Sequence, residues 1–165
     1  MDRYKSELDR KDKISAAVSF PVTVLIFLGG VIVTMARGLS HETEALTVAY
    51  VVGLIFWVVL AGCTLWLLSK AYSGQEYGYL PKLDDLENSR VLFEREEQEN
   101  GPEGDAGAAF ESDLRELIIE VTDVNRQAND MRQAYLDRAN ILLLVVVVMD
   151  ACCGGIYVWD QILKR

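Results

Sequence analysis

Three long apolar runs divide the chain. They cover residues 14–36, 46–69 and 141–159 and contain 23, 24 and 19 residues. The first two runs hold no charged residue, and the third holds one, Asp150. A helix needs about 20 consecutive apolar residues to cross the hydrocarbon core of a bilayer. The pattern therefore predicts three transmembrane helices, the first two joined as an antiparallel hairpin by a short polar connection.

Two of these runs have a competing interpretation. Residues 14–36 could be the core of a signal peptide, but they are longer than such a core, and both signs of charge precede them. The valine-rich start of residues 141–159 could be a buried strand, although its length and the helical pattern before it favour a helix. We also expect the charged residues 5–13 to be helical and to continue directly into the first membrane helix. Pro21 lies within that membrane helix and can kink it.

The segment between the second and third runs is polar and reads as two helices. Residues 83–100 form a charged helical pattern, and residues 101–107, GPEGDAG, interrupt it. No Gly or Pro occurs from residue 108 to residue 140. The sequence thus predicts an all-α membrane protein with a helical or coiled-coil insert between its second and third membrane helices.

Apolar side chains in this last stretch follow a heptad pattern. Leu114, Leu117, Val121, Val124, Ala128, Met131 and Tyr135 alternate spacings of three and four residues, and the same phase continues through Arg138, Leu142, Val145, Met149 and Cys152. This spacing indicates a seam along one helix face. One helix of about 80 Å could then run from about residue 108 to about residue 160. The seam could pack within one chain or between copies, and both remain open.

The basic residues suggest an orientation. Lys and Arg are enriched on the cytoplasmic side of membrane helices. Five precede the first run, whereas the hairpin connection contains Arg37 and the weak base His41. We therefore expect the amino terminus and residues 71–140 in the cytoplasm. The sequence thus predicts three parts. Residues 1–70 contain the amino-terminal helix and the membrane hairpin. Residues 71–140 form a segment for sensing and oligomerisation, and residues 141–165 contain the third membrane helix and a short tail.

Charge narrows the function classes. The net charge is −9, and residues 71–140 contain 17 acidic against seven basic residues. Such a segment argues against broad binding of nucleic-acid phosphates, although a local basic pocket is compatible with it. No nucleophile motif, metal-ligand set or nucleotide-binding glycine pattern is present, so we expect neither an enzyme nor a bound cofactor or metal.

Asp150 is the first candidate for a functional residue. A carboxylate in the middle of a membrane helix costs a few kcal/mol and often marks a function. In an oligomer it could form a ring on a cation path, with Met149, Cys152 and Val145 as further pore-lining candidates. Alternatively, it is protonated, or it is hydrogen-bonded to a Ser, Thr or Cys such as Thr64 or Cys152.

Arginines and aromatic residues of the acidic segment are the second set of candidates. The candidates for binding an anionic ligand are Arg90, Arg95, Arg115, Arg126, Phe93 and Phe110. Guanidinium groups would bind its charge, and aromatic rings would stack on a base. The competing interpretation applies to these arginines and to Arg132 and Arg138: they pair with nearby acids on solvated helix faces.

The arrangement resembles a known group of proteins. A charged amino-terminal helix, YKSELDRKDKI at residues 4–14, a membrane hairpin, a helical insert and a last membrane helix occur in that order. This layout resembles small bacterial membrane effectors of anti-phage defence, and is similar to the membrane component of the Hailong defence system. The resemblance covers the overall plan and residues 4–14.

The resemblance implies a specific activity. The expected protein is a homo-oligomeric, tetrameric ion channel, passing several times through the bacterial inner membrane. A partner nucleotidyltransferase would supply a nucleotide signal, in that system single-stranded oligodeoxyadenylate that holds the channel shut, and its loss would depolarise the cell. The alternative is a non-conducting membrane adaptor whose helical insert docks a soluble partner.

Overall fold

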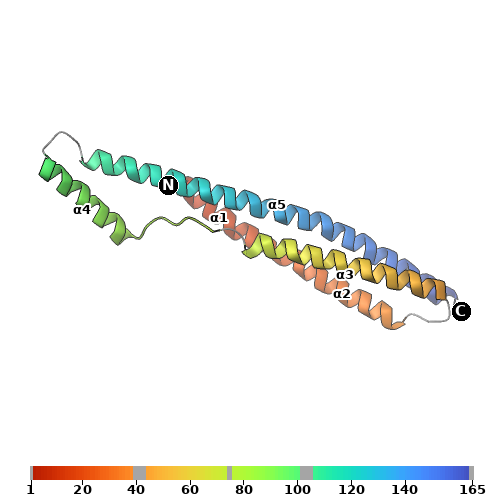
Figure 1. Ribbon diagram of the computed structural model, residues 1–165. Helices are drawn as coiled ribbons and strands as arrows, with labels where there is room; N and C mark the ends of the chain where they lie inside the picture. The colour runs from red at the N-terminus through yellow and green to blue at the C-terminus, as the bar shows by residue number, and fades with distance from the viewer. Residues whose placement is uncertain (1, 39–43, 74–75, 101–105, 164–165) are drawn as a thin grey trace. The chain divides into compact units, whose positions relative to one another are not determined.

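The computed structural model describes residues 2–38, 44–73, 76–100 and 106–163, and nearly all of them are helical. Figure 1 shows the helices in these ranges: α1 (Asp2–Ala17), α2 (Ser19–Gly38), α3 (Glu44–Ser73), α4 (Leu83–Asn100) and α5 (Ala106–Leu163). Three helical stretches, Asp2–Gly38, Thr47–Ser73 and Gly107–Ile162, are long and apolar enough to cross a membrane. The all-α prediction with three such helices is confirmed.

Pro21 separates α1 from α2. Proline has no backbone N–H, so position 21 cannot donate to the carbonyl of Ala17, where a continuous helix would place a hydrogen bond. The helix is interrupted at Val18, and Val22 N donates to the carbonyl of that residue at 3.4 Å. The hydroxyl of Ser19 donates to the carbonyl of Ala16 at 2.7 Å. Pro21 therefore coincides with a one-residue interruption of the helix within the stretch Asp2–Gly38.

The bounds of α4 and α5 agree closely with the ranges predicted from the sequence. α4 has the predicted bounds, and α5 is one unbroken helix of 58 residues that exceeds the expected range at both ends. The predicted linker at 101–107 is wrong in its last two residues, because Ala106 and Gly107 already belong to α5. Residues 101–105 of that linker and His41 of the hairpin connection lie outside the described residues.

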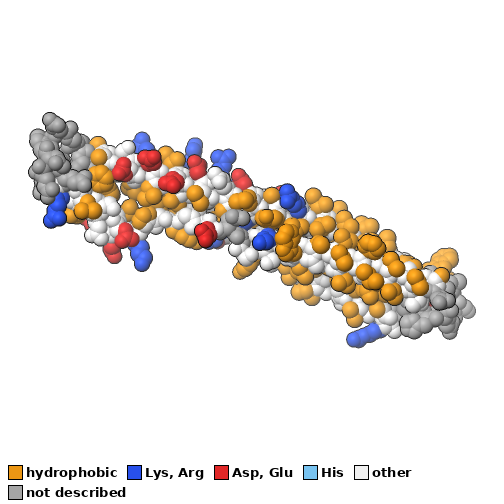
Figure 2. All heavy atoms as spheres, viewed as in Figure 1, with side chains coloured by type: hydrophobic (Ala, Val, Ile, Leu, Met, Phe, Trp, Pro, Cys, Tyr) orange, Lys and Arg blue, Asp and Glu red, His pale blue; other side chains and the backbone are white. Residues whose placement is uncertain are grey.

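The chain forms two compact units. We call Met1–Lys11 with Gln75–Asp130 the polar unit, and Asp12–Gly74 with Met131–Arg165 the apolar unit. Figure 2 shows the contrast between their visible faces. Hydrophobic side chains cover the face of the apolar unit, whereas Lys, Arg, Asp and Glu side chains are scattered over that of the polar unit. These units divide the chain differently from the three predicted segments.

The apolar unit is a bundle of α2, α3 and the carboxyl-terminal part of α5. Its core includes Leu25, Leu28, Ile32, Trp57, Leu68, Leu143 and Val146. Many large apolar side chains face outward instead, among them Phe20, Ile26, Phe27, Phe56 and Leu144, each more than half exposed. An apolar exterior of this kind is suited to contact with lipid tails rather than water.

The face of α5 that is buried in the apolar unit lies one residue away from the predicted seam. In the apolar unit its buried side chains are Arg132, Leu136, Ala139, Leu143, Val146, Asp150, Cys153 and Asp160. One residue corresponds to a turn of about 100° around the helix axis. Met131, Val145 and Cys152 of the predicted seam are consequently exposed. For packing within the apolar unit the predicted phase is wrong, whereas Val121 and Ala128 of the seam are buried in the polar unit. Contact between copies through the exposed members stays a prediction.

Candidate functional site

Asp150 lies inside the apolar unit. Its residue surface is only 7% exposed, although it belongs to one of the most apolar stretches of α5. The side chain of Asp150 continues the buried stripe one turn after Val146, so the helix periodicity directs it into the bundle rather than toward the exterior. Tyr50 and Cys153 are the titratable side chains close enough to interact with its charge.

The carboxyl group of Asp150 lacks a compensating partner. Its Oδ1 atom is buried and forms no hydrogen bond with any described residue. Thr64, a predicted partner, donates its hydroxyl to the carbonyl of Leu60 at 2.8 Å. Cys152, the other, is exposed on α5. The nearest arginine along α5 is Arg138, 12 residues and therefore about 18 Å away in a helix. Neither predicted partner satisfies this carboxyl.

The four pore-lining candidates do not share a face. Asp150 is buried, and Met149 packs against the core while remaining partly exposed. Val145 is 41% exposed and Cys152 is exposed, both on the outside of the bundle. Within this single chain, the buried and the exposed members point in different directions around α5, and the lining of a path between copies stays a prediction.

Close helix contacts surround the level of Asp150. A methyl group added to Gly53 of α3 would lie 3.1 Å from Sγ of Cys153, and one added to Gly154 would lie 3.3 Å from Cε of Met35. Gly29 likewise faces the ring of Trp57, at 3.4 Å. Small residues permit such approaches between membrane helices. The helices are therefore packed closely around the buried carboxyl.

Arg132 has a structural role that the sequence did not reveal. It is 2% exposed, and its Nε donates to the carbonyl of Ala71 at 2.6 Å. Its Nη2 donates to Oγ of Ser15 at 2.8 Å and to the carbonyl of Tyr72 at 3.2 Å. The last carbonyls of a helix have no partners within it and carry partial negative charge. Arg132 therefore caps α3, and its assignment to a solvated face is wrong.

Asn125 holds the non-helical segment that follows α3 in sequence. Its Oδ1 accepts from Gly78 N at 2.9 Å, and its Nδ2 donates to the carbonyl of the same residue at 3.0 Å. The asparagine thus pairs with both backbone groups of one residue. A methyl group on Gly78 would lie 3.2 Å from Val121, so the close approach favours glycine there.

Asn129 attaches the same segment to α1. Its Oδ1 accepts from the hydroxyl of Tyr77, and its Nδ2 donates to the carbonyl and the carboxylate of Glu7, at 2.8 and 2.9 Å. Lys11 of α1 donates to the hydroxyl of Tyr79 at 2.9 Å and lies 4.6 Å from the ring centre of Tyr77. Both asparagines are fully buried, and burial of such amides requires satisfied hydrogen bonds.

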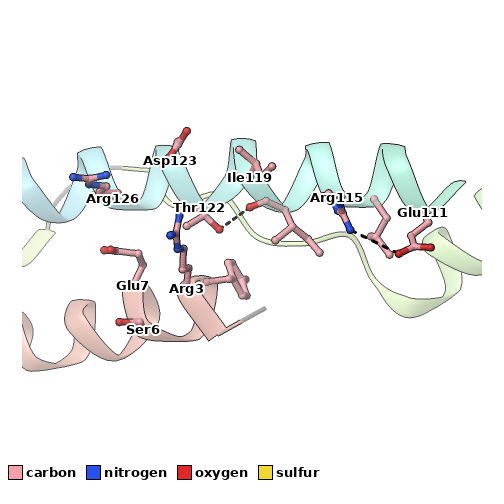
Figure 3. Close-up of a pocket in the computed structure, with 12 residues that line it drawn as sticks. Arg3, Ser6, Glu7, Glu111, Arg115, Ile119, Thr122, Asp123 and Arg126 are labelled. Carbon is pink, nitrogen blue, oxygen red and sulfur yellow. Dashed lines mark hydrogen bonds and ion pairs between the residues drawn. The ribbon is translucent and has the colours of Figure 1, made fainter. Parts of the chain in front are cut away.

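A cavity of about 660 Å³ lies between α1 and the amino-terminal part of α5 in the polar unit. Its lining comprises Arg3, Tyr4, Ser6, Glu7, Glu111, Leu114, Arg115, Ile118, Ile119, Thr122, Asp123 and Arg126. Figure 3 shows Arg3 reaching from α1 toward Thr122, while Asp123 points away from α1. The volume falls in the range typical of small-molecule sites.

The structure brings only two of the six predicted ligand-binding residues into this cavity. Arg115 and Arg126 line it. Phe93 of α4 instead packs edge-to-face on Phe110 of α5, with ring centres 6.0 Å apart. Arg95 is exposed on α4 and does not line the cavity.

Arg90 is engaged within its own helix. It pairs with Glu87 at 2.7 Å and with Glu94 at 3.3 Å. The hydrogen bond to Glu87, together with the charges of both glutamates, raises the pKa of Arg90 above its usual value. Arg90 therefore fits the interpretation in which these arginines pair with nearby acids on a solvated helix face.

Arg3, which the sequence did not single out, joins Arg115 and Arg126 in the cavity. The sequence alone could not pair it with residues more than a hundred positions away. Comparisons of the chain with protein-family models, with curated proteins and with solved structures found no match.

Proposed function

We propose that this protein is an oligomeric membrane effector, a ligand-gated ion channel whose polar unit senses a signal and whose third membrane helix controls permeation. The observation that carries the proposal is the uncompensated carboxyl of Asp150, on a helix that begins in the polar unit at Ala106 and ends at Leu163. An unbroken helix can transmit a displacement over its length, because its backbone hydrogen bonds resist local bending.

The cost of the buried acid supports a functional role. An aspartate at the centre of a membrane helix costs about 3 kcal/mol on the insertion scale. Leucine at position 150 would avoid this cost. A residue that opposes stability in this way is accounted for if its carboxyl contacts water or a cation in another state of the protein.

The close packing around Asp150 corresponds to the closed state of this channel. Oδ1 of Asp150 is buried, and the contact between Gly53 and Cys153 leaves little free space between α3 and α5. Opening would therefore require α5 to rotate or separate from α3. A rotation of one residue, about 100°, would exchange the buried stripe for the exposed stripe that includes Val145 and Cys152.

The resemblance to anti-phage effectors supplies the biological setting of the proposal. The protein would assemble as a tetramer in the bacterial inner membrane, with its polar unit in the cytoplasm. A nucleotide signal from a partner nucleotidyltransferase, such as single-stranded oligodeoxyadenylate, would hold it shut. Loss of the signal during infection would open the channel and depolarise the cell.

Ion flux tests this proposal. Purified ligand-free protein in liposomes should conduct cations, and Asp150→Asn should lower the flux at least several-fold because a fixed negative charge is removed from the path. Asp113→Asn, the same change at an exposed position of α5, is the matched control and should leave the flux unchanged. Equal flux in the native protein and Asp150→Asn would remove Asp150 from the mechanism.

A second function, the non-conducting adaptor, is favoured by a different observation. Val91 and Leu92 of α4 are 50% and 59% exposed, and Ile119 of α5 is 56% exposed, all in the polar unit. Exposed apolar side chains of this kind can form part of a docking surface for a soluble protein. Absence of conductance from the native protein, with or without nucleotide, would favour the adaptor over the channel.

A further inference from the structure

The cavity of the polar unit contains two arginines that have no ionic partner. Arg3 of α1 and Arg126 of α5 form no ion pair or hydrogen bond with any described residue, although both line the cavity. Arg115, by contrast, lies 4.0 Å from Glu111 one turn earlier on α5. Both arginines are exposed at the open side of the cavity. A few charged groups that converge on a concave pocket are the usual means of orienting a small ligand.

The acids of the cavity do not cancel these two charges. Glu7 accepts a hydrogen bond from Asn129 at 2.9 Å and lies 3.8 Å from Arg10. Asp123 points away from the α1 side of the cavity, as Figure 3 shows. Once the pairs are assigned, two guanidinium groups remain available to an anion.

Most of the remaining lining is apolar, and Ser6 and Thr122 add two hydroxyl groups. Leu114 and Ile118 of α5 and Tyr4 of α1 line the cavity, and all three are only partly exposed. Guanidinium groups bind phosphate and carboxylate groups through paired, charge-assisted hydrogen bonds. An anion that also carries an apolar or aromatic part would contact both kinds of lining at once.

We propose that this cavity binds a small amphipathic organic anion, whose phosphate or carboxylate is held by Arg3 and Arg126 and whose apolar part lies on Ile118, Leu114 and Tyr4. This inference deepens the proposed function, because it assigns the position and the chemical class of the ligand that the polar unit senses. The ligand would join α1 to α5, and its binding would favour one arrangement of these helices.

Phenyl phosphate is a suitable probe of this chemistry. Calorimetric titration of the full chain in phosphatidylcholine nanodiscs should show binding, with inorganic phosphate weaker because it lacks an apolar part. Arg126→Gln and Arg3→Gln should each raise the Kd about tenfold or more, since each removes a charge-assisted contact. Arg95→Gln, at an exposed arginine of α4 outside the cavity, is the matched control and should leave the Kd unchanged.

The apolar lining has its own test. Ile118→Ser should weaken phenyl phosphate until it binds no better than inorganic phosphate. Nanodiscs that contain phosphatidylglycerol distinguish a lipid from a soluble ligand, because competition by that lipid with phenyl phosphate would identify a lipid headgroup as the anion. No binding, or equal weakening by Arg95→Gln and Arg126→Gln, would overturn the inference.

Flux measurements separate this inference from the proposed function. In one outcome, Arg126→Gln no longer binds phenyl phosphate, yet in its presence the variant conducts as the native protein does. That result would establish the binding site and contradict its role in gating. Conductance that depends on Asp150, in a protein that does not bind phenyl phosphate, would contradict the site and leave the channel proposal in place.

Discussion

At the scale of single residues, the buried polar groups decide how the helices are held. Asn125 and Asn129 satisfy their amides on the segment after α3, and Arg132 satisfies its guanidinium on the last carbonyls of α3. Asp150 differs from them because Oδ1 has no partner among the described residues. A buried polar group without a partner destabilises a fold, so the first three stabilise it and Asp150 does not.

Arg132 gives a prediction at this scale. Arg132→Ala should lower the free energy of unfolding by about 2–4 kcal/mol, because the end of α3 loses a charged donor. The melting temperature in detergent, followed by circular dichroism, should fall by on the order of 10 °C. Arg132→Lys keeps the charge but not the planar set of donors, so its melting temperature should lie between those of the native protein and Arg132→Ala.

The control for this measurement is Arg138→Ala, which removes an exposed arginine from the same helix and should change the melting temperature little. If the two alanine variants melt together, Arg132 does not cap α3.

At the scale of elements, α5 carries two stripes that differ by one residue. The buried stripe contains Ala139, Leu143 and Val146, and the exposed stripe contains Met131 and Val145. Both stripes follow the heptad spacing, and in the apolar unit apolar periodicity alone selected the exposed one, although Val121 and Ala128 of the predicted seam are buried in the polar unit. It did so because the buried stripe includes Asn125, Asn129, Arg132 and Asp150, which a count of apolar residues omits.

Overpacking distinguishes the two faces of α5. Ala139 is fully buried, and Ala139→Leu should destabilise the bundle by about 1–3 kcal/mol because the added carbons have no space. Ala151→Leu makes the same change on an exposed face of α5 and should be nearly neutral. Thermal unfolding in one detergent compares them directly, and equal melting temperatures would contradict the burial pattern described for α5.

At the scale of the whole molecule, assembly is the central prediction. The exposed members of the predicted seam, including Val124 and Met131, are 43% and 44% exposed and remain available for contact between copies. Light scattering of the detergent-solubilised particle should give a protein mass several times that of the 18.5 kDa chain, and four times if the protein is a tetramer.

A substitution on the exposed stripe tests how the copies meet. Met131→Glu should reduce the mass of the particle, because it places a charge in an apolar contact. Gln127→Glu adds the same charge at another exposed position of α5 and should leave the mass unchanged. A native particle with the mass of a single chain would exclude assembly through this seam.

The sequence by itself determined the elements. Apolar runs of about 20 residues leave helices as the way to satisfy backbone hydrogen bonds in a membrane, which is why the three spanning helices could be predicted. The absence of Gly and Pro from residues 108–140 indicated a long α5, and Pro21 indicated the break in the first span. These features depend on neighbours along the chain, so local reasoning was sufficient.

Only the tertiary structure decided which face of each helix is buried and which distant groups meet. The cap of α3 by Arg132, the pairing of Asn125 with Gly78 and the cavity that joins Arg3 to Arg126 connect residues 47 or more positions apart. Such contacts depend on the rotation of each helix about its axis. A single residue turns that face by about 100°, and only the packing of all the helices together fixes it.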